Sequence, residues 1–480
     1  MTDLLCLNAP FMPYFSRPSR SPCVTRGGTL YYPISLLTMT SYAIQKGFDA
    51  RIMDCIAQPN PQWKEKIKEM NPKFILVDAS TPSIMNDVAI ADELQRMLPK
   101  SKVVLVGRHV TYAPTESLNF CKNVDVVTRR EFYPQIIEIL EGKSYQSIKG
   151  ISYKDNEKIK HNPDAEIIKD VNAFGFISKV IKEQLDVQSY FYSSLRNPYI
   201  MLQSAWGCPY NCSFCNEIVK TRYRHRDLES IIDELKWIKT NLPMVKEVLW
   251  DDPTFVVDEN FTHQLCNAMI DNKINLHWST MTRANISLET LKAMKKSGAR
   301  VMHIGLESAT QQSLNLINKN MEFEKEVEYL ENCKKAGILN HACFIVGLPG
   351  DTKETIKATI DKVKKLPAID SIQCFPLIPT PFENILDKEA EGTIWKYLVD
   401  NNYILTRDYT KWLKPNGSYN CVVSYPHLTN VEIENLVEQF YKEFYYRGSF
   451  MFKKLIQSLK SLDEFKRNYR SFMTFRSRSV

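Results

Sequence analysis

The feature that most constrains the fold of this chain is a regular alternation of short apolar runs and helix-like stretches in its second half. This alternation predicts parallel strands joined by helices. Six such units make most of a (β/α) barrel rather than a closed eight-fold one, and barrel enzymes place their chemistry at the carboxyl ends of the strands. The predicted strands are 199–206, 247–252, 276–283, 301–308, 341–347 and 371–377, and the predicted helices are 228–240, 259–272, 288–297, 324–335 and 353–365.

A second alternation occupies the N-terminal part of the chain, with predicted strands at 4–8, 49–54, 74–79, 103–107 and 124–127 and helices at 33–46, 62–70, 87–98 and 133–141. It predicts a doubly wound, Rossmann-like parallel sheet, whose ligands bind beyond the carboxyl ends of the strands. A polar stretch, KDNEKIKHNPDAEIIKD (154–170), interrupts the pattern as a linker or hairpin. We therefore expect an α/β protein with a doubly wound domain (1–145), a linker (146–192), a partial (β/α)6 barrel (193–386) and a helical C-terminal region (387–480).

The composition, with 44% hydrophobic and 24% charged residues, is typical of a soluble globular protein. The first residues, MTDLLCLNAPFMPYF, lack a signal-peptide pattern, and no run approaches about 18 apolar residues, so we expect a cytoplasmic protein. The net charge is +7, and residues 451–480 carry six of these charges. Because the excess is confined to this tail, we expect no nucleic-acid partner.

Three cysteines, Cys208, Cys212 and Cys215, lie within eight residues directly after the first predicted barrel strand. A zinc site usually needs four ligands from two pairs, and the sequence has no second CxxC or HxxxH pair to complete one. Three thiolates can instead hold three irons of a 4Fe-4S cluster and leave the fourth iron open, whereas electron-transfer clusters normally have every iron bound by cysteine. The spacing therefore favours a cluster at which chemistry takes place.

This CxxxCxxC motif, with Phe214 before its last cysteine and a six-fold βα series around it, resembles that of the radical S-adenosylmethionine (SAM) enzymes. The resemblance implies that Cys208, Cys212 and Cys215 bind the cluster and that the open iron holds the amino and carboxylate groups of SAM. Electron transfer then cleaves SAM to a 5′-deoxyadenosyl radical. The backbone near Phe214 is expected to meet the adenine.

Four later segments, LWDDPTF, WSTMTRAN, IGLESAT and FIVGLPGDT, match the family in order and position, whereas PTPFE (379–383) departs from its Pro-Gly-Thr segment. The last of the four matches the turn beneath the adenine. The resemblance implies these SAM contacts: Asp251 and Asp252 for the methionine amine, Ser279 or Arg283 for its carboxylate, and Glu307 and Ser308 facing the cofactor.

The N-terminal domain before such a barrel resembles that of the cobalamin-binding radical SAM enzymes, in which the corrinoid lies against the carboxyl edge of the sheet. The matching segments are RIMDC, VLVGRHVTYAP and DVVTRREFYPQIIEIL, with Arg108 in place of a usual glycine. No Asp-x-His-x-x-Gly motif is present in the sequence, so cobalt ligation by histidine is not expected. A domain that has kept this fold and lost the cofactor is the alternative. The implied cobalamin contacts are Asp54, Gly107, His109 (as a polar wall residue), Thr111 and Glu131.

The expected function is cobalamin-dependent methylation of an unactivated carbon in a small-molecule or lipid-like substrate, with a reductant such as flavodoxin or ferredoxin. Three alternatives stay open: radical cyclisation or rearrangement, an RNA methylthiotransferase, and a non-enzymatic corrinoid-binding protein. The basic tail predicts an amphipathic helix that either packs on the barrel or rests on a membrane surface. Its apolar positions are Phe452, Leu455, Leu459, Leu462, Phe465, Tyr469 and Phe472.

Overall fold

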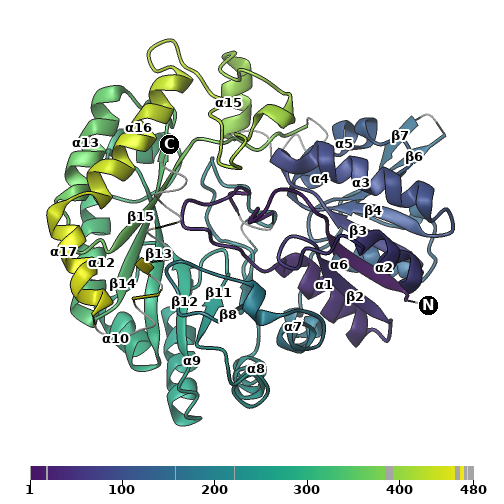
Figure 1. Cartoon of the computed structure of the whole chain (residues 1–480), viewed down its shortest axis with the longest axis horizontal. Helices are drawn as coiled ribbons and strands as arrows, with labels where there is room; N and C mark the ends of the chain where they lie inside the picture. Colours follow the sequence, from purple (N-terminus) through teal and green to yellow (C-terminus); the bar gives the residue numbers. More distant parts are fainter. Residues whose placement is uncertain are drawn as a thin grey trace.

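The computed structural model describes residues 2–17, 20–156, 158–220, 222–383 and 393–459, together with 465, 466, 468, 469 and 473. Two α/β halves lie side by side in it (Figure 1), one around each of the two predicted sheets. The predicted fold class is therefore confirmed. No helix among the described residues has the length and apolarity needed to cross a membrane.

The N-terminal sheet has the strand order β2-β1-β3-β4-β5-β6-β7, and its first five strands run parallel. The order 2-1-3-4-5 is that of a flavodoxin-like doubly wound sheet. Its parallel strands are β1 (Leu4–Asn8), β2 (Ala50–Asp54), β3 (Phe74–Asp78), β4 (Lys102–Val106) and β5 (Val126–Thr128). The helices are α1 (Ile34–Gln45), α2 (Trp63–Met70), α3 (Ile84–Met97), α4 (Arg108–Tyr112), α5 (Pro114–Phe120) and α6 (Tyr133–Leu140).

The first part of the expected linker belongs to this sheet. Strands β6 (Ile151–Asp155) and β7 (Lys158–His161) form an antiparallel hairpin. Strand β6 of this hairpin pairs antiparallel with β5. Arg129 fixes the hairpin, because its buried guanidinium donates to the Ile151 carbonyl at 2.8 Å and to Ser152 Oγ at 2.7 Å. The sheet thus runs on to His161, beyond the expected boundary at residue 145. Helix α7 (Ile177–Gln184) follows before the barrel.

The second sheet contains six parallel strands in the order β15-β14-β13-β12-β11-β8, the open partial barrel that the sequence predicts. Its strands are β8 (Tyr199–Leu202), β11 (Glu247–Trp250), β12 (His277–Thr282), β13 (Ala299–Glu307), β14 (Leu339–Val346) and β15 (Ser371–Pro376). The connecting helices are α8 (Leu228–Asn241), α9 (Glu259–Asp271), α10 (Leu288–Lys296), α11 (Gln311–Leu316), α12 (Phe323–Ala336) and α13 (Lys353–Lys364).

The described part of the C-terminal region is helical, as predicted. It contains α15 (Ile394–Asp400), α16 (Asn430–Tyr445) and α17 (Gly448–Ser458), and irregular chain separates α15 from α16. The Thr429–Glu432 capping box starts α16. Much of the predicted amphipathic helix, including Leu462 and Phe472, lies outside the described residues. Its contact with a membrane stays a prediction.

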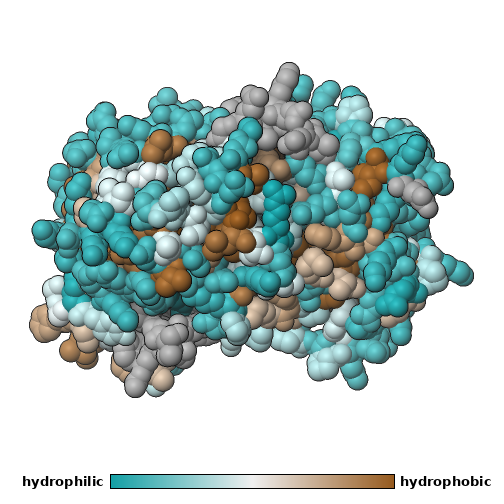
Figure 2. Space-filling model, turned by 90° about the horizontal axis from the view of Figure 1, so that it is seen from above, coloured by the Kyte–Doolittle hydropathy of each residue, from teal (hydrophilic) through white to brown (hydrophobic). Residues whose placement is uncertain are grey.

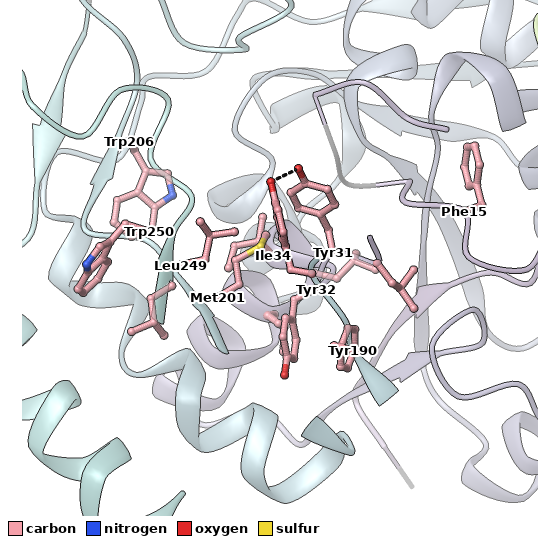
Figure 3. Close-up of a cluster of buried hydrophobic side chains, with 14 of the residues drawn as sticks. Phe15, Tyr31, Tyr32, Ile34, Tyr190, Met201, Trp206, Leu249 and Trp250 are labelled. Carbon is pink, nitrogen blue, oxygen red and sulfur yellow. Dashed lines mark hydrogen bonds between the residues drawn. The ribbon is translucent and has the colours of Figure 1, made fainter. Parts of the chain in front are cut away.

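The two halves share one continuous hydrophobic core. Figure 3 shows Tyr32 and Tyr190 close together, with the barrel side chains Met201 and Trp250 in the same cluster. The Tyr32 and Tyr190 rings stack at 3.7 Å between centroids, and the Tyr32 hydroxyl donates to the Tyr199 carbonyl on β8 at 2.9 Å. Residues 9–17 and 20–33, called the N-terminal strap below, bring Tyr32 to this position. A shared core of this kind fixes the relative placement of the halves.

Candidate active site

A cavity of about 330 Å³ separates the carboxyl ends of the two sheets, and we call it the central cavity. One wall is lined by residues 78–82, which begin at the last residue of β3, and by residues 107–108, which follow β4. The opposite wall comes from the cysteine motif and from the carboxyl ends of the barrel strands. Both folds place ligands at these strand ends, so one space serves both halves. Figure 2 shows apolar residues exposed along the seam between the two halves.

The loop that carries the three cysteines is closed at its base by β9 (Ala205–Trp206) and β10 (Arg224–His225), which pair antiparallel. Gly207 begins the loop with φ +77°, and a Cβ there would lie 2.2 Å from the Arg222 carbonyl oxygen. Cys208, Cys212 and Cys215 all line the central cavity. Burial raises the pKa of the Cys208 thiol to about 11, so iron binding must displace its proton.

The described residues contain no group of three or more His, Cys, Asp or Glu side chains that could hold a single metal ion. A cubane cluster does not require such a group, because each of its thiolates binds a different iron. Cys208, Cys212 and Cys215 line one wall of one cavity from a single loop. This donor set fits the cluster.

Arg283 lies beside the cysteines at the carboxyl end of β12. Its Nη1 donates to Cys212 Sγ at 3.3 Å, its guanidinium lies 3.9 Å from the centroid of the Tyr210 ring, and its other nitrogen donates to the Lys319 carbonyl. A fixed positive charge next to a thiolate stabilises the thiolate. The structure thus brings this predicted residue to the cluster motif.

Asp251 follows β11 and lines the central cavity, as does Phe214. The Arg20 guanidinium of the strap lies 3.9 Å from Asp251 Oδ1 and donates to the Asp252 carbonyl at 2.7 Å. Burial raises the pKa of Asp251, and the charge of Arg20 opposes this increase. Sequence reasoning missed Arg20, because its Pro-, Ser- and Arg-rich segment has no periodic pattern that assigns it to the barrel mouth.

Glu307 ends β13 with φ +65°, a conformation that costs a non-glycine residue energy and is often found at functional sites. The pairing of β13 with β14 shifts register here, which turns Glu307 into the central cavity. Its Oε1 lies 3.1 Å from Lys319 Nζ, which also donates to the Gly305 carbonyl at 2.8 Å. Lys319 is a second cavity residue that the sequence did not identify.

Three other predicted SAM contacts do not line the central cavity. The Asp252 carboxylate accepts hydrogen bonds from the backbone N–H groups of Ser204 at 2.8 Å and Ala205 at 3.1 Å, and from the Ser204 hydroxyl. Ser279 lies deep in β12, where its hydroxyl donates to Glu247 Oε1. The Ser308 hydroxyl contacts Thr310 Oγ1 at 3.0 Å. These three side chains bond to neighbouring residues of the chain, and their contact with SAM stays a prediction.

Among the predicted cobalamin contacts, only Gly107 lines the central cavity. The other four are engaged elsewhere. Asp54 accepts from Asn8 Nδ2 and the Tyr190 hydroxyl, both at 2.8 Å, and Thr111 donates to the Gly107 carbonyl at 2.8 Å. His109 is buried, with Nδ1 3.2 Å from Thr81 Oγ1, and burial lowers its pKa to about 3. Glu131 forms an ion pair with Arg224 at 2.5 Å, which joins the two halves.

The wall formed by the N-terminal sheet is nevertheless suited to a flat macrocycle. Gly107 has φ +112°, and a Cβ at this position would lie 2.4 Å from Asp78 Oδ1 and 2.5 Å from the Ala79 carbonyl oxygen. Ala79 and Ser80 present small side chains to the cavity and Gly107 has none, and Arg108 lies beside them. A wall of small residues lets a corrin ring approach the backbone closely, so these residues fit cobalamin.

Two family models match the chain: residues 205–363 match the radical SAM superfamily, and residues 21–133 match the B12 binding domain. The chain is 26% identical over 450 residues, 92% of its length and 93% of the relative's, to a Pyrococcus horikoshii protein named an uncharacterized methyltransferase. It is 27% identical to the anaerobic magnesium-protoporphyrin IX monomethyl ester cyclase of Cereibacter sphaeroides, over 62% of this chain and 50% of the cyclase.

Among solved structures, the radical SAM methyltransferase TsrM of Kitasatospora setae, with cobalamin and a [4Fe-4S] cluster bound, has the same fold. Its TM-score is 0.68, with 15% identity and 99% of each chain covered. The two family matches include the cysteine loop and most of the N-terminal sheet that face each other across the central cavity. Together they assign a 4Fe-4S cluster, SAM and cobalamin to this protein. Residues 205–363 therefore form a radical SAM domain and residues 21–133 a B12-binding domain, the same combination of domains as in the cobalamin-dependent radical SAM enzymes.

Proposed function

We propose that this enzyme transfers a methyl group to an unactivated carbon of a small-molecule substrate. The observation that carries the proposal is that the three cysteines and the Gly107 wall border the same cavity. When bound, the cluster supplies the electron that cleaves SAM, and cobalamin supplies the methyl group. Both cofactors would then act on a single substrate carbon without its leaving the cavity.

The side chains that line the central cavity have distinct roles in this proposal. Cys208, Cys212 and Cys215 bind the cluster. Arg283 can pair with the methionine carboxylate of SAM, because its planar guanidinium is already fixed beside Cys212. Asp251 would hold the methionine amine, whose positive charge would add to that of Arg20 beside the same carboxylate.

The pair of Glu307 and Lys319 supports the same assignment. Because Lys319 Nζ lies 3.1 Å from Glu307 Oε1, the carboxylate enters the cavity already oriented and with its charge balanced. An oriented carboxylate can accept hydrogen bonds from the hydroxyl groups of SAM without a large desolvation cost. We expect Glu307 to position SAM rather than to exchange a proton.

Radical cyclisation is the second candidate, favoured by the similarity to the Cereibacter cyclase. This chain spans only half of the length of that relative, so the similarity leaves out part of the other enzyme. The two reactions differ in how they use SAM. Methyl transfer consumes SAM as a methyl donor and forms S-adenosylhomocysteine, whereas cyclisation needs only its radical cleavage.

The test uses anaerobically purified protein with a reductant such as flavodoxin or ferredoxin. Mass spectrometry quantifies 5′-deoxyadenosine and S-adenosylhomocysteine, and the proposal predicts both, whereas cyclisation predicts the first alone. Cys212→Ala should abolish both products. Cys266→Ala, at a buried cysteine in α9 outside the cavity, should retain them. Equal product formation by Cys212→Ala and the wild type would contradict the proposal. Chemical analysis should find about four iron and four sulfide ions per chain. A methylthiotransferase carries a second cluster and would give about eight of each, so the lower number would exclude it.

A further inference from the structure

A second cavity, of about 480 Å³, lies at the amino ends of β13, β14 and β15, and we call it the barrel cavity. Helices α16 and α17 form its outer wall. It shares four lining residues with the central cavity: Tyr192, His341, Gln373 and Phe375. The two cavities therefore adjoin at these residues, and together they extend along the inside of the barrel strands. The size of the barrel cavity is that of small-molecule sites, about 300–1,000 Å³.

Strands β14 and β15 both border this space. Ser371, Gln373 and Phe375 of β15 line the cavities, and so does Ile372. On β14, His341 and Cys343 line the central cavity, and Asn340 lines the barrel cavity. The interior of a closed barrel is normally filled by layers of Val, Ile and Leu. Here several inward positions hold polar or small side chains, and the barrel interior stays open.

The outer wall of the barrel cavity is mostly apolar. Tyr441 and Tyr445 of α16 bond to the edge strand β15. The Tyr441 hydroxyl donates to the Cys374 carbonyl at 2.9 Å, and the Tyr445 hydroxyl donates to the Ile372 carbonyl at 2.7 Å. Their rings are left as apolar surface beside Phe450 and Leu455 of α17. This wall favours an apolar ligand.

Three of the four charged side chains that line the barrel cavity form ion pairs, and the ammonium of the fourth, Lys454, lies 5.6 Å from the centroid of the Phe450 ring. Arg26 pairs with Glu438, Arg300 Nε lies 2.8 Å from Glu247 Oε2, and Asp370 Oδ1 lies 2.7 Å from Lys453 Nζ. A charged ligand group would have to compete with these pairs, which is unfavourable in a buried site. The cavity therefore suits an uncharged molecule.

The junction between the two cavities carries neutral hydrogen-bonding groups. His341 Nδ1 lies 2.7 Å from Ser371 Oγ, and its Nε2 lies 3.5 Å from Gln373 Oε1. Burial lowers the pKa of His341 to about 4, so its ring is neutral at pH 7. His303, which also lines the central cavity, lies 5.1 Å from His341 between ring centroids. A hydroxyl or carbonyl group of a ligand can bond to such a junction, whereas a carboxylate or ammonium would meet no opposite charge there.

We propose that the barrel cavity holds the body of the substrate, an elongated, uncharged and largely apolar molecule with a hydroxyl or carbonyl group at the His341–Gln373 junction. The reacting carbon would then lie in the central cavity, within reach of the cofactors. This assignment rests on the proposed function, because it needs an active site in the central cavity. It adds the class of substrate, which the cofactors alone leave undetermined.

The test measures binding of Nile red, an uncharged apolar dye, by fluorescence titration of the anaerobic full-length protein. We compare two neighbouring aliphatic residues of α17. Leu455 lines the barrel cavity and Ile456 does not, although both are exposed, at 60% and 44%. Leu455→Trp should raise the Kd of the dye about tenfold by filling the cavity, and Ile456→Trp should leave it unchanged. Ser458→Trp, at another lining residue, serves as a second variant if Leu455→Trp does not fold.

Equal dye affinity in the wild type, Leu455→Trp and Ser458→Trp would overturn the assignment. So would a result in which only Ile456→Trp binds the dye more weakly, because the dye would then lie on the outer face of α17. Formation of 5′-deoxyadenosine by the wild type is measured separately. If SAM cleavage fails while the dye result holds, the proposed function is at fault. If cleavage succeeds and the dye result fails, the substrate assignment is wrong.

Discussion

Arg283 connects two parts of the site, because one side chain contacts Cys212 of the cluster motif and the Lys319 carbonyl behind Glu307. A hydrogen bond to a charged group contributes about 1.5–3 kcal/mol, so Arg283→Gln should weaken SAM binding about tenfold to a hundredfold. Isothermal titration of the iron-loaded protein measures this affinity. Arg283→Lys keeps the charge without the planar fork and should give an intermediate value. Wild-type affinity in Arg283→Gln would show that the carboxylate of SAM binds elsewhere.

Gly107 allows a second prediction at the scale of one residue. Gly107→Ala must place a Cβ 2.4 Å from Asp78 Oδ1 at φ +112°, so it should lower the free energy of unfolding by about 2–4 kcal/mol. Gly142→Ala is the matched control, since Gly142 has φ +80° with no atom within 4 Å of the added Cβ, and it should cost only about 1 kcal/mol. Denaturant unfolding measures both, and equal losses would refute the close approach at Gly107.

The same residue scale shows why the sequence identified only part of the site. Asp251 and Asp252 are neighbours, and Asp251 lines the cavity whereas Asp252 bonds to the backbone of Ser204 and Ala205. Successive side chains at a strand end point in opposite directions. A sequence motif that contains both aspartates therefore does not indicate which of the two faces the cavity. Ser279 lies four residues before Arg283, which is about 13 Å along a strand and too far from the mouth. Arg20 and Lys319 were not predicted, because they contact site residues that are far from them in the sequence or lie on other elements.

At the scale of the element, helix α12 carries a buried carboxyl group that makes stability depend on pH. Glu326 is fully buried, and neither of its carboxyl oxygens has a hydrogen-bond partner among the described atoms. Burial raises its pKa to about 8, an effect that Lys319 partly opposes. The folded protein therefore holds a proton that the unfolded chain releases near its ordinary pKa of 4.5.

The sign of the effect follows from this raised pKa. The stabilising contribution is fully present below about pH 4.5 and is lost as the pH rises through about 8. Glu326→Gln should remove this dependence, so that the variant gains up to about 4 kcal/mol over the wild type between pH 5 and pH 9. Urea unfolding across this range tests the prediction. Parallel pH profiles for the two proteins would contradict it.

Strands and helices with a strong apolar period could be predicted closely from the sequence. Strand β1 has the expected bounds, and the six barrel strands appear in the expected order because buried parallel strands read as apolar runs. The polar stretch at 154–170 predicts a linker or hairpin, and the structure forms a hairpin of β6 and β7 there. That this hairpin extends the N-terminal sheet could not be predicted, because β7 is polar and pairs through its backbone at the sheet edge. Helices α4 and α5 are short and lack such a period, and they were not expected.

At the scale of the whole molecule, two sheets that could each bind a ligand alone are held with their carboxyl ends facing one space. The shared core around Tyr32 and the ion pair of Glu131 with Arg224 fix this arrangement. Arg224→Leu should therefore leave a buried carboxylate unpaired and destabilise the protein by about 3 kcal/mol, measured by thermal or denaturant unfolding. Glu131→Gln with Arg224→Leu should restore part of this loss, and no recovery in the double variant would show that the pair does not join the halves.

The central claim is that the three cysteines hold a cluster whose open iron takes SAM at the mouth of the barrel. Electron paramagnetic resonance of the reduced, anaerobic protein, recorded before and after addition of SAM, tests it most directly. We predict a 4Fe-4S signal that changes when SAM is added and that is absent in Cys212→Ala. A signal that SAM leaves unchanged, or one that Cys212→Ala retains at wild-type intensity, would contradict the claim.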